Sequence, residues 1–110
     1  MPTVYKVLGQ SFPTTTANAN LYTVPASTSA IISTLSITNV TTSPATCRVF
    51  VRIAGAAAAT SNAVLYDINI AANSVATFTM GVTLATTDIV TVQSSVANTL
   101  TFQAFGTEIS

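Results

Sequence analysis

Residues 30–53 read AIISTLSITNVTTSPATCRVFVRI and contain two runs in which the side chains alternate in character. One phase of the first run holds Ile31, Leu35 and Ile37, and the other holds Ile32, Thr34, Ser36 and Thr38. One phase of the second run holds Cys47, Val49, Val51 and Ile53, and the other holds Arg48, Phe50 and Arg52. A period of two residues is that of a strand with one buried face. Residues 41–44 include Pro44 and separate the runs, so the stretch predicts a β-hairpin with one face in a core.

Similar short runs recur on both sides of this stretch. They predict strands at residues 4–11, 21–24, 63–70, 74–80 and 99–107, and one that begins at Asp88. Residues 54–62 are rich in alanine, but the run is too short to nucleate a helix, so we expect a loop there. About eight antiparallel strands with frequent turn signals are typical of an all-β, jelly-roll-like β-sandwich. We expect one such domain over residues 1–110, with a strand order that the sequence leaves open.

Charge is scarce in this chain of 110 residues. Only 5% of the residues are charged and the formal net charge is zero, whereas charged residues make up about 25% of an ordinary domain. Because near-zero net charge promotes association, we expect a subunit whose surfaces are covered in an assembly. A solitary but adhesive monomer is the alternative. Three basic residues give no footprint for nucleic acid, and no apolar run approaches the length of a membrane span.

The residues that usually carry catalysis or bind metals are few. The chain has no histidine, and its only carboxylates are Asp67, Asp88 and Glu108, on separate predicted strands or turns. Acid–base and nucleophilic catalysis generally need a histidine or a tuned carboxylate pair. The single cysteine, Cys47, falls in the apolar phase of its strand, so we expect a small buried hydrophobic residue. We therefore expect no enzyme activity, no cofactor and no metal site.

Arg48, Phe50 and Arg52 form a stripe on the predicted non-core face of their strand. Arginine and aromatic residues are enriched at interface hot spots, so the stripe is a candidate contact between subunits. The alternative is that other elements cover this face and that each arginine pairs with a carboxylate. Tyr5 and Lys6 lie in the first predicted strand, whose phase is ambiguous, as suits an edge or a subunit contact.

Five segments carry a resemblance to a known family. They are KVLGQS at 6–11, LYTVPA at 21–26, RVFVRIAGA at 48–56, ATTDIVTV at 85–92 and FGTEI at 105–109. In this order they resemble small virion structural proteins of tailed bacteriophages, including phages of cyanobacteria. The resemblance runs over nearly the whole chain, and residues 56–63 match least. It implies a non-enzymatic subunit of the phage particle, typically a capsid decoration (cement) protein seated as trimers on the shell. We therefore expect residues 1–11 to reach a neighbouring subunit or the shell on which the subunit is seated.

Three functions follow as hypotheses. The first is a homotrimeric decoration protein that binds the major capsid protein, is made in the host cytoplasm and resides in the virion, on the phage head. The second is a neck, tail or fibre component, which would bind other virion proteins. The third is a carbohydrate-binding or host-attachment module, which would need exposed aromatic rings. The chain has three tyrosines, five phenylalanines and no tryptophan, and most of these rings fall in core phase. We expect neither nucleic acid nor membrane as a partner.

Overall fold

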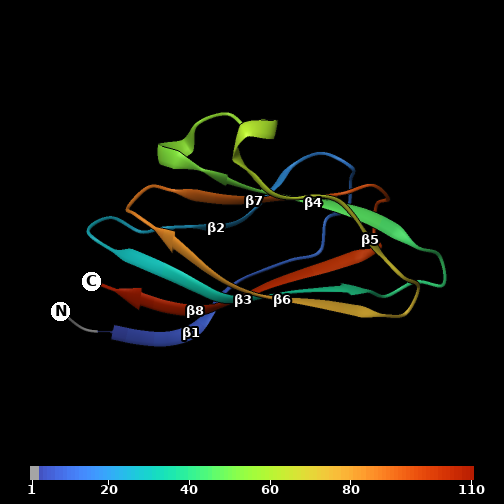
Figure 1. The fold of residues 1–110 in the computed structure, drawn as a ribbon, viewed down its shortest axis with the longest axis horizontal. Coiled ribbons are helices and arrows are strands. Elements are labelled where there is room, and N and C mark those ends of the chain that lie inside the picture. The colour runs from blue at the N-terminus through green and yellow to red at the C-terminus, as the bar shows by residue number, and fades with distance from the viewer. Residues whose placement is uncertain (1–2) are drawn as a thin grey trace.

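The computed structural model describes residues 3–110 and shows two four-stranded antiparallel sheets packed face to face (Figure 1). The strands are β1 (Thr3–Ser11), β2 (Ala19–Thr23), β3 (Ser29–Asn39), β4 (Ala45–Arg52), β5 (Ala63–Ile70), β6 (Val75–Leu84), β7 (Ile89–Ser94) and β8 (Leu100–Ile109). Two short 3-10 turns, η1 (Ile53–Gly55) and η2 (Thr60–Asn62), lie between β4 and β5. The predicted all-β sandwich of eight antiparallel strands is therefore confirmed.

The strand order is that of a jelly roll. The first sheet has the order β1-β8-β3-β6, and the second has the order β2-β7-β4-β5. Only the connection from β4 to β5 joins neighbouring strands of one sheet, and every other connection crosses to the opposite sheet. This alternation closes eight strands around one core, as in jelly-roll domains.

The predicted hairpin over residues 30–53 is wrong. β3 pairs with β6 and β8, whereas β4 pairs with β5 and β7. The two strands face each other across the core, so their apolar phases are buried as predicted, but no hydrogen-bonded ladder joins them. The buried amide of Asn39 holds the crossing: it donates to the carbonyls of Ser43 and Ile70 and accepts from the N–H and hydroxyl of Thr41.

The core between the sheets is mostly aliphatic, with Phe102 and Tyr22 also buried in it. A bulge in β3 decides which side chains of that strand face this core. Ala30 and Ile32 are buried before the bulge at Ser33, and Leu35 and Ile37 are buried after it. The sequence pattern placed Ile31 with Leu35, but the extra residue at the bulge reverses the phase, so that Ile31 faces outward. Cys47 lies in this core, as expected.

The N-terminal strand is part of the same β-sandwich as the rest of the chain. β1 pairs along its length with β8, and its Leu8 is buried. Residues 3–11 therefore form the edge of the first sheet, and they do not extend away as an arm. Met1 and Pro2 lie outside the described residues. In the described part of the chain, no helix has the length and hydropathy of a membrane span.

Candidate functional site

The outer face of the first sheet carries no charged side chain among residues 3–110. We call it the uncharged face. Its side chains alternate with the buried ones along each strand and pair across the sheet. They are Thr3, Tyr5, Val7, Gln10, Ser29, Ile31, Thr34, Ser36, Thr38, Val75, Thr77, Thr79, Thr83, Thr101, Gln103, Phe105, Thr107 and Ile109.

The six charged residues of the chain all lie elsewhere. Arg48, Arg52 and Asp67 are on the second sheet, and Asp88 is in the turn before β7. Lys6 and Glu108 belong to the first sheet but lie on its inward side, since they are in register with Gly106 and with the buried Ala30 respectively. The separation of charge from this face is therefore complete in the described structure.

Apolar side chains form two adjacent rows on the uncharged face. Tyr5 and Ile31 flank Thr107 in one row, and Val7 lies beside Phe105 in the next. Tyr5 is 82% exposed and Ile31 is 37% exposed. Hydroxyl and amide side chains surround these rows, as the rim of a protein contact surrounds its centre. Tyr5, predicted from the sequence as a contact residue, thus belongs to a contact-like surface, whereas the bulge at Ser33 concealed the outward phase of Ile31.

Lys6, also selected from the sequence, forms an ion pair with Glu108 at a distance of 3.1 Å between Nζ and Oε1. The hydroxyl of Tyr22, on the second sheet, donates to the same carboxylate at 2.5 Å. The hydrogen bond from Tyr22 and the one from Lys6 lower the pKa of Glu108. Burial and the carboxylate raise the pKa of Tyr22 above its usual range. Lys6 therefore contributes to a link between the two sheets.

The lowered pKa of Glu108 predicts acid sensitivity. A carboxyl whose pKa is lower in the folded state stabilises the fold above its ordinary pKa of about 4.3, and this stabilisation disappears as the pH falls through the folded-state value. We expect Glu108→Gln to melt at a lower temperature than the wild type at pH 7. At pH 3 we expect a smaller difference between the two melting temperatures. Thermal unfolding followed by circular dichroism measures both. A difference that is independent of pH would contradict this assignment.

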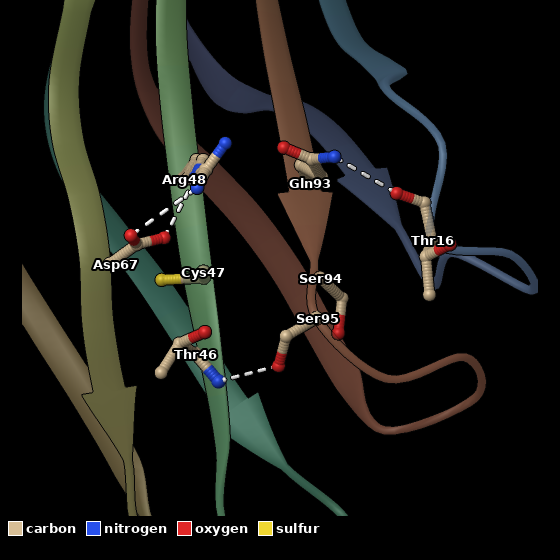
Figure 2. Close-up of a pocket in the computed structure, with 8 residues that line it drawn as sticks. All are labelled: Thr16, Thr46, Cys47, Arg48, Asp67, Gln93, Ser94 and Ser95. Carbon is tan, nitrogen blue, oxygen red and sulfur yellow. Dashed lines mark hydrogen bonds and ion pairs between the residues drawn. The ribbon is translucent and has the colours of Figure 1, made fainter.

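Arg48 is the centre of a second surface, the outer face of the β2-β7-β4-β5 sheet. Its guanidinium bonds the carboxylate of Asp67 through Nε at 2.7 Å and Nη2 at 3.3 Å. The guanidinium carbon lies 4.1 Å from the ring centroid of Tyr66. Gln93 is directly opposite Arg48 on β7, and its amide donates to the carbonyl of Thr16 (Figure 2). Four segments of the chain thus meet here.

A bulge in β5 brings both Tyr66 and Asp67 to Arg48. The register between β4 and β5 shifts between Cys47 and Val49, and Asp67 adopts a positive φ of 53°. Bulges of this kind redirect side chains and are common beside functional sites. The hydrogen bond from Arg48 lowers the pKa of Asp67 and raises that of the guanidinium.

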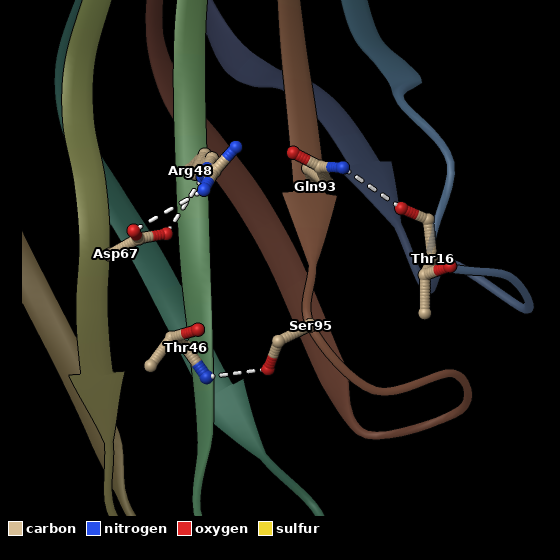
Figure 3. Close-up of polar contacts among 6 residues, drawn as sticks. All are labelled: Thr16, Thr46, Arg48, Asp67, Gln93 and Ser95. Atoms are coloured by element: carbon tan, nitrogen blue, oxygen red, sulfur yellow. Dashed lines mark hydrogen bonds and ion pairs between the residues drawn. The ribbon is translucent and has the colours of Figure 1, made fainter.

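Two hollows flank this centre, and we call them together the polar groove. One has a volume of about 210 Å³ and is lined by Thr16, Thr46, Cys47, Arg48, Asp67, Gln93, Ser94 and Ser95 (Figure 2). The other has a volume of about 270 Å³ and is lined by Asn18, Arg48, Phe50, Ala58, Ala59, Thr60, Tyr66 and Gln93. Both hollows share Arg48 and Gln93. Figure 3 shows the polar contacts around the first hollow, including the bond from the N–H of Thr46 to the hydroxyl of Ser95.

The arginine stripe predicted from the sequence is on the outer face, but it is not fully open. Phe50 is only 5% exposed, so its ring is covered, as the alternative interpretation of this face expected. It lines the second hollow beside Ala58, Ala59 and Thr60, and this small-residue loop lies over the sheet (Figure 1). Burial under a loop cannot be deduced from strand periodicity, because the covering residues belong to another segment.

Arg48 and Arg52 both form hydrogen bonds with other groups of the same domain. Arg48 pairs with a carboxylate, as the alternative interpretation expected. Arg52 instead donates to the carbonyls of Gly55 and Ala56 and to the side chains of Asn20 and Thr91. The five residues selected as an interface therefore do not form one surface: Arg48, Phe50 and Arg52 are on the second sheet, and Tyr5 and Lys6 are on opposite sides of β1.

The described residues offer little for nucleophilic or metal chemistry. Burial raises the pKa of Cys47 to about 11, so its thiol stays protonated. Asp88 accepts from the backbone N–H groups of Ala54 and Ala85, which fixes the loop before β7. No group of three or more metal-ligating side chains occurs within residues 3–110.

Comparisons with known proteins give a structural likeness alone. No protein-family model matches the sequence, and no curated protein matches it. Three solved chains match the fold. One is from a structure of infectious bursal disease virus, strain Gx, with a TM-score of 0.53 and 12% sequence identity. The match covers 97% of this chain and 31% of the viral chain, so this protein spans about a third of the length of that chain.

Proposed function

We propose that this chain is a non-enzymatic virion structural protein, and specifically a capsid decoration (cement) protein that binds the head shell of a tailed phage as a homotrimer. The uncharged face is the observation that carries the proposal. The resemblance of five segments to small phage virion proteins supports it. The likeness in fold to a chain from a virus structure is consistent with a role in a virion.

The uncharged face has the size and chemistry of a protein contact. Four strands about 4.8 Å apart and roughly ten residues long give a flat area of about 600 Å². A standard interface buries about 800 Å² per partner. Covering this face removes no ionic group from water, and therefore avoids the desolvation penalty that a buried charge incurs. The apolar rows around Ile31 provide the centre, and the surrounding hydroxyls provide hydrogen bonds.

The solution mass tests the oligomeric part of the proposal. We expect light scattering on a sizing column to give three times the 11.3 kDa of one chain across a dilution series. Ile31→Lys should convert this species to a monomer, because it places an unpaired charge in the contact. Ile53→Lys is the matched control: Ile53 is 73% exposed in η1, over the opposite sheet. Dissociation in both variants, or in neither, would reject the face as the contact.

Binding to purified phage particles tests the location. A decoration protein should sediment with undecorated heads, and Ile31→Lys should reduce the bound amount by at least tenfold. Sedimentation with tails and not with heads would favour the neck, tail or fibre alternative. A dilution-stable monomer that sediments with neither would contradict the virion proposal.

A further inference from the structure

Two polar atoms in the groove have hydrogen-bonding capacity that residues 3–110 do not use. The Nη1 group of Arg48 donates to no described residue, because Nε and Nη2 make the bonds to Asp67. The side-chain oxygen of Gln93 accepts from none, because the bond to Thr16 uses the amide nitrogen. In Figure 2 this oxygen points toward Arg48, and one guanidinium nitrogen points away from Asp67. An available donor and an available acceptor thus lie on neighbouring strands.

The charge around these atoms favours a neutral ligand. Arg48 and Asp67 are the only charged residues that line either hollow, and they neutralise each other. An anion would approach the carboxylate of Asp67, and a cation would approach the guanidinium, so an ion of either sign meets repulsion as well as attraction. A polar ligand without charge meets no such repulsion, and its dipoles can still form hydrogen bonds with either group.

The shape of the groove suits an extended ligand. Each hollow is smaller than the roughly 300–1,000 Å³ of typical ligand pockets, but Arg48 and Gln93 line both of them, so a ligand that spans these two residues would reach both hollows. The first hollow offers the hydroxyls of Thr16 and Ser95, and the second offers the half-exposed ring of Tyr66. The groove therefore combines hydroxyl-bonding groups with an aromatic ring beside them.

We propose that the polar groove is a binding site for a neutral oligosaccharide. Sugar hydroxyls both donate and accept hydrogen bonds, so two adjacent hydroxyls match the donor of Arg48 and the acceptor of Gln93. The guanidinium of Arg48 lies over one face of the Tyr66 ring, so the apolar C–H face of a neighbouring sugar ring would pack on the other face. Asp67 and Thr16 are positioning residues, because they fix the guanidinium and the amide from behind. This inference concerns the second sheet and does not depend on the virion role.

Nuclear magnetic resonance on the whole ¹⁵N-labelled chain tests the site. The probes are cellotriose, maltotriose, triacetylchitotriose and the neutral members of a microbial glycan array. We expect at least one to give saturable shifts of the Gln93 side-chain amide, the Arg48 Nε–H and the backbone of residues 58–60. Gln93→Ala and Arg48→Lys should each weaken that binding at least tenfold, while the spectrum keeps the dispersion of a folded chain.

Gln103→Ala is the matched control, because Gln103 lies on the uncharged face and accepts from Gln10. The Gln103→Ala variant should bind the glycan with the affinity of the wild type. The proposal is overturned if no neutral glycan shifts the groove resonances, or if Gln93→Ala and Arg48→Lys bind as the wild type does. Binding confined to acidic glycans would also overturn it, since the charge argument excludes them, and so would binding confined to short peptides, which are another class of ligand.

Discussion

Gly106→Ala is expected to lower the free energy of unfolding by about 3 kcal/mol or more, because β8 has no space for a side chain there. A Cβ at Gly106 would lie 1.9 Å from the carbonyl oxygen of Ile31 and 3.1 Å from the Cα of Ile32. These are backbone atoms of β3, which cannot rotate away as a side chain does. The two central strands of the first sheet must separate locally and lose ladder hydrogen bonds.

Thermal unfolding at a fixed protein concentration measures this effect. For a domain of this size, the loss corresponds to a fall in melting temperature of roughly 10 to 20 °C. Gly81→Ala is the matched control, because a Cβ at Gly81 on β6 meets no atom within 4 Å. We expect that variant to melt within a few degrees of the wild type. Equal melting temperatures for the two variants would mean that β3 and β8 adjust freely.

Asn39→Ala is expected to destabilise the fold by about 3 kcal/mol, since it leaves several buried polar groups without partners. The side chain is 1% exposed and makes four hydrogen bonds. Its amide nitrogen satisfies the carbonyls of Ser43 and Ile70, and its oxygen satisfies two donors of Thr41. These bonds hold the chain where it leaves one sheet for the other.

Chemical denaturation with urea measures the change, with Asn69→Ala as the matched control. Asn69 is exposed on β5, and its side chain makes no hydrogen bond within residues 3–110. We expect the control to stay within about 0.5 kcal/mol of the wild type, as is usual for surface substitutions. A loss below about 1 kcal/mol for Asn39→Ala would show that water replaces the amide at the crossing.

The losses of folding free energy expected for Gly106→Ala and Asn39→Ala depend on features that the sequence pattern did not reveal. Asn39 reads as the polar end of a strand, and nothing nearby marks it as buried. Gly106 reads as an ordinary glycine near the C-terminus. Each depends on atoms of a distant segment: Ile70 for Asn39 and Ile31 for Gly106.

The candidate sites were partly predictable. Period-two alternation placed Arg48 and Arg52 on an outer face, and the ambiguous phase of β1 pointed to Tyr5 at a sheet edge. The polar groove was not predictable, because the register that places Gln93 opposite Arg48 joins strands far apart in the chain. The same holds for the loop that covers Phe50.

The sequence by itself determined that this chain forms β-strands, about how many, which side chains of most strands enter the core, and that its surface carries almost no charge. These properties depend on composition and on a period of two, both of which are local. Only the tertiary structure decided that β3 and β4 lie in different sheets, that the bulge at Ser33 reverses a phase, and that all six charges avoid one face. Strand pairing is a contact between distant segments, and alternation along one strand does not specify its neighbour.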